Sequence, residues 1–308
     1  MRNEFAKTLT ELAKHNKDIV LLAGDIGNKL FDNFKAKYPD RFYNCGVAEA
    51  NMTGVASGLA SSGLRPITYT ITPFNTARCF EQIRLDVCYP NLPVIIVGTG
   101  SGLSYASLGA THHSMEDIAI LRTLPNLQIV CPADTREVRA CIIEALKSNK
   151  PTYIRLGKKG EPKIHKKIPK LKIGKGLILK KGKDLAILGV GNTLSIAKEC
   201  TEYLAKKNIF ADLISFHTPK PLDSKLLGSL FKSKKLIIII EEHGLIGGVG
   251  SAVLEWANLN KKDASKVIRF GGPDKFLTGC GNQKEARKLI GLDSKKIGLK
   301  ILESIKKQ

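Results

Sequence analysis

Short apolar segments alternate with longer amphipathic segments along most of this chain, and this alternation limits the folds that it can adopt. In the first half the expected strands cover residues 18–25, 42–47, 65–72, 92–100, 127–134 and 151–160, and the expected helices cover residues 48–62, 74–89, 115–124 and 135–148. Short apolar strands joined by helices of this length are typical of a parallel sheet with helices on its faces. We therefore expect an α/β fold with mainly parallel sheets.

The rhythm is interrupted at residues 163–183, a stretch rich in Lys, Gly and Pro, and a second alternation of strands and helices follows it. At about 100–200 residues per domain, 308 residues suggest two domains. We predict a first domain over residues 1–162, a linker over 163–183 and a second domain over 184–308. Each domain is expected to be a mainly parallel sheet flanked by helices.

The chain carries 49 Lys and Arg against 28 Asp and Glu, a formal net charge of +21. Such a charge would suit nucleic acid or an acidic membrane surface. However, the basic residues are not sharply clustered, aromatic residues make up 6%, and no basic patch interleaved with aromatic residues is present. We therefore expect a Lys-rich solvated surface and no binding of nucleic acid, while an anionic substrate or an acidic partner stays compatible with the charge.

The seven cysteines form no CxxC pair and lie mostly among apolar residues, which indicates reduced thiols in a cytoplasmic protein. Their spacing supports no structural zinc site, and we expect no metal ligands on this chain. The N-terminal segment reads as an amphipathic helix and not as a signal peptide. The apolar run 236–244 is too short to cross a bilayer, so we expect no membrane segment.

Two glycine-rich loops raise the question of a nucleotide site. The loop at 189–194 follows a strand and opens a helix, but Leu194 stands where a dinucleotide fingerprint has its third glycine, and no P-loop is present. The loop at 247–251 is explained more simply as a helix start packed closely on another segment of backbone. We do not expect a nucleotide site.

Three motifs carry a more specific signal: GVAEANMTGVASGLA at 46–60, GATHHSMEDIAILRTLPNLQIVCPAD at 109–134 and EEHGLIGGVGS at 241–251. In this order the chain resembles the C-terminal half of transketolase and 1-deoxy-xylulose-5-phosphate synthase, and more distantly the beta chain of pyruvate-dehydrogenase-type enzymes. The resemblance covers almost the whole chain. It implies a pyrimidine-binding domain followed by a transketolase C-terminal domain, with thiamine diphosphate as the cofactor.

The sequence has no GDG motif, which in these enzymes begins the site for the diphosphate and its Mg²⁺, and we expect no such domain ahead of Met1. The resemblance therefore implies a split enzyme, in which a partner subunit with a GDG…N motif supplies the diphosphate and Mg²⁺ site. We expect an α₂β₂-type assembly in which this chain also dimerises through both domains.

Glu49 is the one acid in the first of these motifs, at the start of an expected helix rich in small residues. By the resemblance, its carboxyl group bonds to pyrimidine N1′ of the cofactor and favours the imino tautomer that removes the thiazolium C2 proton. An apolar pocket would help the carboxyl group to hold and share a proton. Without the surrounding motifs, an acid stabilised by the helix dipole would be the simpler interpretation.

Three further residues match cofactor-binding positions of the family. Phe74 would provide an aromatic face for the aminopyrimidine, Phe80 would line the same pocket, and Asp25 would lie near the cofactor after the first strand. Ala77 stands where the family has another aromatic residue, which implies a looser pocket. The alternatives are ordinary helix core for the two Phe residues and a turn-capping role for Asp25.

The histidine pair in the second motif matches substrate-binding positions. His112 would bond an oxygen of the ketose donor and could move a proton, and the adjacent His113 is closer to the synthase pattern. The alternative is a surface loop with two solvated histidines. At the end of the first domain, Lys158 falls on the phosphate-binding arginine of the family, with Arg155 close by.

Three positions depart from typical transketolases: Gly100 replaces a histidine, Leu108 replaces a sugar-reading aspartate, and Lys158 replaces an arginine that could bind phosphate with two parallel bonds. These departures suggest an atypical sugar, such as a deoxygenated, non-phosphorylated or short ketose.

The sequence thus predicts the pyrimidine-binding subunit of a thiamine-diphosphate-dependent, two-chain transketolase, which transfers a two-carbon ketol unit from a ketose to an aldehyde. Two alternatives stay open: the beta chain of a 2-oxo acid decarboxylase, and a structural subunit without catalytic function. The paired histidines argue against the first, because sugar oxygens need such donors, and the presence of Glu49 and Phe74 argues against the second.

Overall fold

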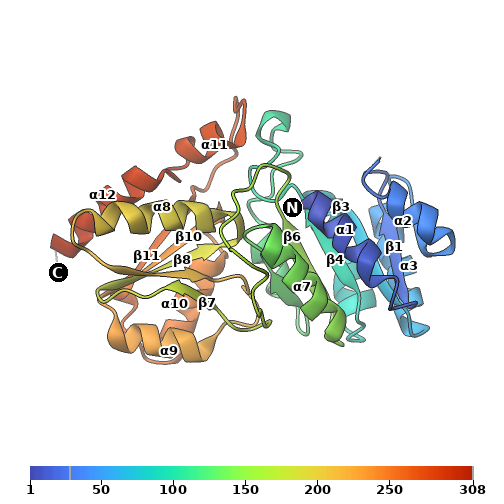
Figure 1. Cartoon of the computed structure of the whole chain (residues 1–308), viewed down its shortest axis with the longest axis horizontal. Coiled ribbons are helices and arrows are strands. Elements are labelled where there is room, and N and C mark those ends of the chain that lie inside the picture. Colours follow the sequence, from blue (N-terminus) through green and yellow to red (C-terminus); the bar gives the residue numbers. More distant parts are fainter. Residues whose placement is uncertain (28, 307–308) are drawn as a thin grey trace.

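The computed structural model describes residues 1–27 and 29–306, and its chain forms two α/β units that lie side by side (Figure 1). Each unit is built on one sheet, and the strands of both sheets are largely buried on both faces. The expected fold class is therefore confirmed.

The first sheet has six strands in the order β2-β1-β3-β4-β6-β5, and all of its neighbouring strands are parallel. Its strands are β1 (Ile19–Ala23), β2 (Phe42–Asn44), β3 (Arg65–Ile71), β4 (Ile95–Thr99), β5 (Gln128–Val130) and β6 (Thr152–Leu156). All five residues of β1 are buried, as expected for a parallel strand that is covered on both faces. Alternate residues of β1 therefore contact different layers of helices.

Helices cover both faces of this sheet. They are α1 (Arg2–Leu12), α2 (Asp32–Lys37), α3 (Glu49–Ser61), α4 (Thr72–Asn75), α5 (Phe80–Gln82), α6 (Asp117–Leu121) and α7 (Thr135–Lys147). Leu21 of β1 packs in a cluster with α1, α2 and α7, whereas Leu22 packs in a cluster with α3 and α6. Helix α7 begins after Asp134, whose carboxylate accepts hydrogen bonds from two backbone N–H groups of the first turn.

The second sheet has the order β11-β10-β8-β9-β7, with β7 antiparallel to β9 and the other pairs parallel. Its strands are β7 (Leu177–Lys180), β8 (Leu185–Val190), β9 (Ala211–Ser215), β10 (Leu236–Gly244) and β11 (Val267–Gly272), and its helices are α8 (Leu194–Ala205), α9 (Ser224–Ser233), α10 (Val249–Leu259), α11 (Gln283–Leu289) and α12 (Ser294–Lys306). Strand β7 lies within the predicted linker 163–183, so part of that segment is an edge strand of the second sheet.

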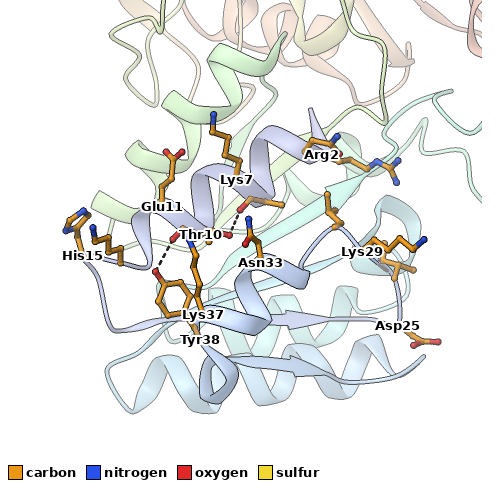
Figure 2. A pocket seen from close by; sticks show the side chains of 16 residues that line it. Arg2, Lys7, Thr10, Glu11, His15, Asp25, Lys29, Asn33, Lys37 and Tyr38 are labelled. Carbon is orange, nitrogen blue, oxygen red and sulfur yellow. Dashed lines mark hydrogen bonds between the residues drawn. The ribbon is translucent and has the colours of Figure 1, made fainter.

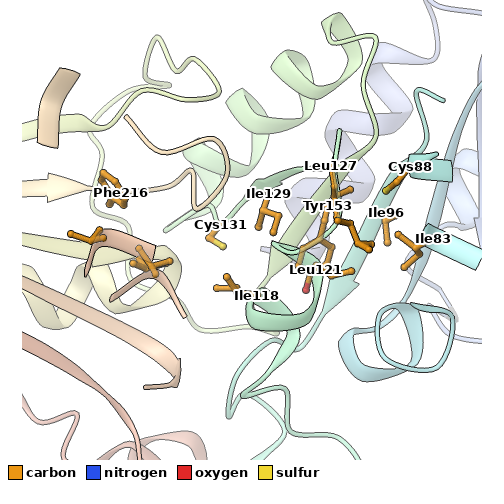
Figure 3. Close-up of a cluster of buried hydrophobic side chains, with 14 of the residues drawn as sticks. Ile83, Cys88, Ile96, Ile118, Leu121, Leu127, Ile129, Cys131, Tyr153 and Phe216 are labelled. Carbon is orange, nitrogen blue, oxygen red and sulfur yellow. The ribbon is translucent and has the colours of Figure 1, made fainter. Parts of the chain in front are cut away.

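One hydrophobic cluster extends through both units. It joins Ile118 and Ile129 of the first unit to Leu188, Phe216 and Ile239 of the second (Figure 3). Because burial of apolar surface stabilises at about 25 cal/mol per Å², a shared cluster favours a fixed contact between the two sheets. This contact places the loop after β4 against the end of β10.

The predicted helix 74–89 is wrong as a single helix. The chain forms α4, then a turn over residues 76–79, then α5 and a turn of π-helix at Ile83–Cys88. The buried amide of Asn75 donates to the backbone oxygen of Val97 at 2.9 Å, and the hydroxyl of Thr76 donates to the backbone oxygen of Thr72 at 2.7 Å. Side-chain bonds of this kind compete with a regular helix, and here they shape the turn that carries Arg78.

Within the part of the chain that the structure describes, no helix is both long and apolar enough to cross a bilayer. The same residues contain no cluster of three or more His, Cys, Asp or Glu side chains that could hold a metal ion.

Candidate active site

Glu49 is the first residue of α3, and its side chain is 2% exposed although it is an acid. The chain reaches it from β2, and its aliphatic part lies against the end of β1. A Cβ atom added at Gly24 would lie 3.1 Å from Cβ of Thr70 and 3.4 Å from Cγ of Glu49. The glycine after β1 therefore relieves a tight contact with Thr70 beside this buried side chain.

Arg78 closes the exposed side of this acid. Its Nη1 donates to Oε2 of Glu49 at 2.8 Å, and the side chain of Arg78 is 46% exposed. The same guanidinium lies over the ring of Phe74, with Cζ 4.3 Å from the ring centroid. Glu49 and Phe74, which the sequence assigns to one pocket, are thus joined through Arg78. Ala77, which stands where the family has another aromatic residue, is exposed.

His112 also contacts Phe74. The two rings are 5.2 Å apart with an edge-to-face geometry, and the ring of Tyr105 lies 5.8 Å from His112. The ammonium group of Lys158 lies over Tyr105, 4.2 Å from its centroid. Contacts therefore run without interruption from Glu49 to Lys158, and they bring together four of the residues that the sequence assigns to cofactor and substrate: Glu49, Phe74, His112 and Lys158.

The conformation of Gly100 explains how Tyr105 reaches this position. Gly100 has a φ of +75°, and a Cβ atom at this residue would overlap the ring of Tyr105. The histidine that typical transketolases carry here would be excluded, because the aromatic ring fills its space. Leu108, at the other departure from the family pattern, is 49% exposed at the end of a short 3₁₀ turn (Ala106–Leu108).

The environment of His112 favours a neutral imidazole. Partial burial lowers the pKa of His112, and the neighbouring His113 and Lys158 lower it further. Its Nδ1 lies 2.9 Å from the hydroxyl of Thr111. Burial also lowers the pKa of Lys158, together with the positive charges of Arg2 and Lys159. A neutral imidazole beside an ammonium group is suited to bind an oxygen atom of an anionic ligand.

The other predicted substrate residues have different surroundings. His113 is 6% exposed, and its Nε2 lies 3.1 Å from the backbone oxygen of Ala106. This contact stabilises the loop, and His113 does not join the contacts that His112 makes with Phe74 and Tyr105. Arg155 is 3% exposed and forms an ion pair with Asp117 at 2.7 Å. Its position on β6 therefore argues against the predicted phosphate-binding role.

Two predicted cofactor residues lie away from this chain of contacts. Phe80 packs on the core and lines a different cavity of about 480 Å³ with Leu85, Cys88 and Leu124, which is the helix-core alternative. Asp25 is exposed with a φ of +50°, and it exchanges hydrogen bonds with Asn44, each of 3.1 Å. Asp25 therefore stabilises the turn after β1.

Asp25 also lies at one end of a large open groove of about 1,140 Å³ (Figure 2). The groove runs between α1 and α2, and basic residues line much of it: Arg2, Lys7, Lys14, Lys29 and Lys37. The predicted site residues other than Asp25 do not line this groove. We therefore place the candidate site at the contacts around Glu49 and not in this larger groove.

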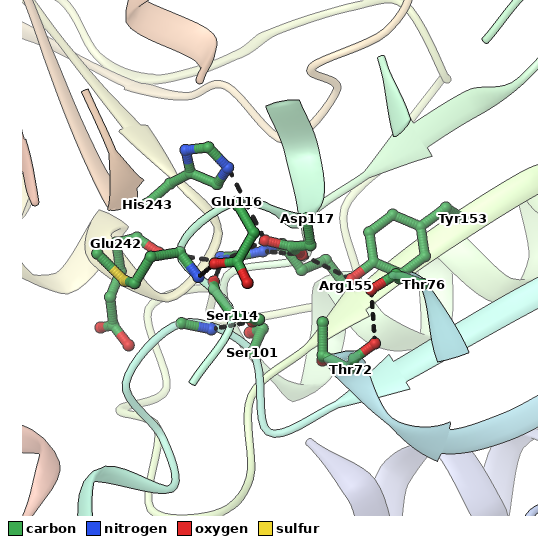
Figure 4. A network of polar contacts seen from close by, with 12 residues as sticks. Thr72, Thr76, Ser101, Ser114, Glu116, Asp117, Tyr153, Arg155, Glu242 and His243 are labelled. Carbon is green, nitrogen blue, oxygen red and sulfur yellow. Dashed lines mark hydrogen bonds and ion pairs between the residues drawn. The ribbon is translucent and has the colours of Figure 1, made fainter. Parts of the chain in front are cut away.

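A buried polar network connects the site loop to the second unit (Figure 4). Arg155 bonds to Asp117, and it also donates to the backbone oxygens of Ser114 and Glu242 at 2.9 and 3.0 Å. Burial alone would raise the pKa of Asp117, but the charge and hydrogen bonds of Arg155 outweigh it and hold that pKa below its usual value. The carboxylate of Glu242, which is fully buried, accepts a hydrogen bond from the N–H group of Leu103 at 2.7 Å.

Three participants were missed in the sequence: Arg78, Tyr105 and Glu242. Arg78 follows Phe74 by four residues, a spacing at which two side chains contact each other on a helix. In this structure the two side chains are brought together by a turn over residues 76–79. Tyr105 could have been found from the Gly100 departure, since a glycine in place of a histidine leaves space for another ring. Glu242 gave a weaker signal, because its contact depends on how the two units pack.

Each of the two α/β units corresponds to a known protein family. Residues 1–162 match the family "Transketolase, pyrimidine binding domain", and residues 174–297 match "Transketolase, C-terminal domain". The chain belongs to the transketolase family.

Individual relatives agree with this assignment. A putative transketolase C-terminal section of Methanocaldococcus jannaschii is 35% identical over 100% of this chain and 97% of that protein. One subunit of an apulose-4-phosphate transketolase from Phocaeicola vulgatus is 34% identical over 99% of this chain and 97% of its own. The 1-deoxy-D-xylulose-5-phosphate synthase of Desulfotalea psychrophila is 36% identical over 99% of this chain, but the match spans 48% of that enzyme.

Solved structures give the same result. A split-gene transketolase, described as an inactive beta4 tetramer, superposes with a TM-score of 0.91 at 34% identity, with 99% of this chain and 98% of that chain covered. A transketolase variant from Pichia stipitis superposes with a TM-score of 0.81 at 19% identity, over 99% of this chain and 45% of its own, which supports the fold alone.

The residues around Glu49 fit the aminopyrimidine of thiamine diphosphate, the cofactor of this family. That ring needs a carboxyl group at one nitrogen and an apolar surface against its face. The buried carboxylate of Glu49 has a half-exposed partner, Arg78, and an aromatic ring beside that partner. Both requirements are therefore met at one place on this chain.

Proposed function

We propose that this chain is the pyrimidine-binding subunit of a thiamine-diphosphate-dependent, two-chain transketolase. The observation that supports this most strongly is the buried carboxylate of Glu49, placed in contact with a cation that also covers Phe74. An isolated acid at 2% exposure is costly unless it has a partner with which it forms hydrogen bonds. A functional demand for that acid explains why the sequence keeps it among small apolar residues.

The residues of this chain have distinct roles in the proposal. Glu49 holds a proton at the pyrimidine nitrogen of the cofactor, and Phe74 provides a surface for the ring. When bound, thiamine diphosphate supplies the carbon nucleophile for cleavage and transfer of a two-carbon ketol unit. His112 bonds an oxygen of the sugar, and Lys158 holds an anionic group of the substrate as a point charge.

The diphosphate and Mg²⁺ sites belong in this proposal to a partner subunit with a GDG…N motif. Two relatives of matching length support a partner, because each is named as one subunit of a transketolase. The complex is proposed to be of the α₂β₂ type. A cytoplasmic location is consistent with the cysteines, because none of the seven forms a disulfide.

The substrate is proposed to be a ketose phosphate other than the common pentose phosphates. Two relatives are named for apulose 4-phosphate, and in this chain Tyr105 fills the position of a family histidine while Leu108 replaces a sugar-reading acid. A ring and an apolar side chain at these places would favour a sugar with fewer or differently placed hydroxyl groups.

Reconstitution tests the proposal. This chain is mixed with the GDG…N partner, thiamine diphosphate and Mg²⁺, and ketol transfer is measured with apulose 4-phosphate and with xylulose 5-phosphate as donors. We expect activity from the mixture and from neither chain alone, with loss of activity and intact assembly for Glu49→Gln. Equal turnover by Glu49→Gln would contradict the catalytic role and favour a structural subunit.

A further inference from the structure

Arg78 makes two contacts that belong, in the proposed function, to the aminopyrimidine. Its guanidinium donates to the carboxylate of Glu49 at 2.8 Å and lies over the ring of Phe74 at 4.3 Å. A guanidinium is planar, carries N–H donors in its plane and stacks on aromatic rings. The aminopyrimidine is likewise planar, bonds to a carboxyl group through its edge and packs through its face.

The two groups compete for the same partners. Within the described residues, the hydrogen bonds of the Glu49 carboxylate include one side-chain donor, which is Arg78. A ring that bonds to Oε2 of this carboxylate and packs on the face of Phe74 that Arg78 covers needs the space that the guanidinium occupies. The overlap concerns both the edge contact and the face contact, so a small shift of Arg78 along one of them would not release the other.

We propose that Arg78 is a displaceable plug of the cofactor site, which mimics the aminopyrimidine in the empty chain and must swing out before the cofactor binds. This inference rests on the proposed function of Glu49 and Phe74. It adds that the empty chain is held in a closed state, and that the closed state lowers its apparent affinity for the pyrimidine.

Exposure and local structure allow this movement. The side chain of Arg78 is 46% exposed, whereas that of Glu49 is 2% exposed, so the cation can move into solvent while the acid stays in place. Arg78 lies on the turn between α4 and α5 and not within a regular helix. By contrast, Arg155 is 2% exposed in its ion pair with Asp117 and could not leave without unfolding its surroundings.

The plug also explains how the empty chain tolerates a buried acid. A carboxylate without a partner in an apolar site is strongly disfavoured, and the guanidinium compensates its charge until another donor arrives. Exchange of one planar donor for another gives the carboxylate a partner both before and after the cofactor binds. The plug thus stabilises the empty chain and sets a threshold for cofactor binding.

The test measures binding of 4-amino-5-hydroxymethyl-2-methylpyrimidine to the full chain by isothermal calorimetry and saturation-transfer NMR. Variants Arg78→Ala and Arg78→Lys remove the planar mimic, and Lys keeps a charge near Glu49 in case the Ala variant folds poorly. Arg84→Ala is the matched control, because Arg84 is an exposed arginine of the same region that pairs with Glu81. The single variant Glu49→Gln and the double variant Glu49→Gln/Arg78→Ala test whether binding depends on the carboxyl group.

If the closed state holds about nine-tenths of the empty chains, removal of the plug strengthens apparent binding about tenfold, since the apparent Kd equals the intrinsic Kd divided by the competent fraction. We expect this gain for Arg78→Ala, a smaller gain for Arg78→Lys, no change for Arg84→Ala and loss of the gain in the double variant. Binding that is unchanged or weaker in Arg78→Ala but still lost in Glu49→Gln would overturn the plug and leave the proposed function standing. Binding that Glu49→Gln leaves unaffected would overturn both.

Discussion

The backbone N–H group of Leu103 donates to the carboxylate of Glu242 at 2.7 Å, across the boundary between the two sheets and 139 residues apart in the chain. Gly102 allows this approach, because a Cβ atom there would lie 2.6 Å from Oε1 of Glu242. Arg287 and Gln283 of α11 hold the same carboxylate. The second unit therefore fixes the start of the loop that carries His112.

Replacement of Glu242 by Ala should lower the free energy of unfolding by about 3–5 kcal/mol, because it leaves the partly buried Arg287 without its partner. Urea denaturation measures this, and limited proteolysis should show earlier cleavage in the loop 100–114. Glu255→Ala is the control: Glu255 is 60% exposed in its pair with Arg122, so we expect a loss of ~1 kcal/mol or less. Equal effects of the two variants would contradict this account.

The pH dependence of stability should reveal the pair His165–Asp134, whose atoms lie 3.1 Å apart. Burial alone would lower the pKa of His165, but the hydrogen bond to Asp134 and the charge of Glu137 outweigh it and raise that pKa above the ordinary 6.5. A raised pKa stabilises the folded state fully below pH 6.5, and this contribution is lost as the pH rises through the folded value.

Urea denaturation between pH 5.5 and 8.5 should therefore show a decrease of stability that begins near pH 6.5. His165→Gln should remove that decrease, whereas substitution of the exposed His15 by Gln should leave it. A pH profile of the same shape for His165→Gln would show that another group is responsible.

The pKa of His112 should respond to one lysine much more than to its neighbour. Partial burial, His113 and Lys158 all lower this pKa, so Lys158→Met should raise it. The ammonium group of Lys158 lies over Tyr105, whose ring contacts His112, so Lys159→Met at the adjacent position should change the pKa of His112 much less. NMR titration of the imidazole protons gives the measurement, and equal shifts in the two variants would contradict the proximity of Lys158 to His112.

One thiol should react much faster than the others. Cys45 is partly exposed, whereas the other six cysteines are buried. Burial raises the pKa of Cys45 as well as those of Cys79, Cys88, Cys131, Cys141 and Cys200, so the faster reaction of Cys45 depends on its access to the reagent. Brief treatment with iodoacetamide followed by mass spectrometry should find modification mainly at Cys45, and Cys45→Ser should abolish it. Rapid labelling of a second cysteine would show that the core opens more easily than its packing implies.

The sequence predicted the architecture well because apolar periodicity records burial. Strands such as β1 and β10 are continuous apolar runs, and the structure places both in parallel sheets. The helix expected at 74–89 failed because Asn75 and Thr76 form side-chain bonds with neighbouring backbone, which no periodicity reveals. Likewise, the predicted linker 163–183 contains the edge strand β7, whose pairing depends on a partner strand more than 30 residues away.

The sequence predicted those residues of the candidate site that lie in short motifs. Glu49, Phe74, His112 and Lys158 meet as one chain of contacts, although their functional roles stay predictions. Phe80 was predicted from the family pattern and Arg155 from its proximity to Lys158 along the chain, and neither signal shows which face of a strand or helix a side chain takes. Arg155 points into the boundary between the units, and Phe80 lines a separate cavity.

The central claim is that the carboxyl group of Glu49 bonds to the pyrimidine nitrogen of thiamine diphosphate. The direct test is ¹⁵N NMR of the complex reconstituted with cofactor that is labelled at N1′, for the native chain and for Glu49→Gln. The account predicts a large change in the N1′ chemical shift on binding to the native chain, and a clearly smaller change with Glu49→Gln although the cofactor is still bound. The same N1′ shift in both complexes would contradict it.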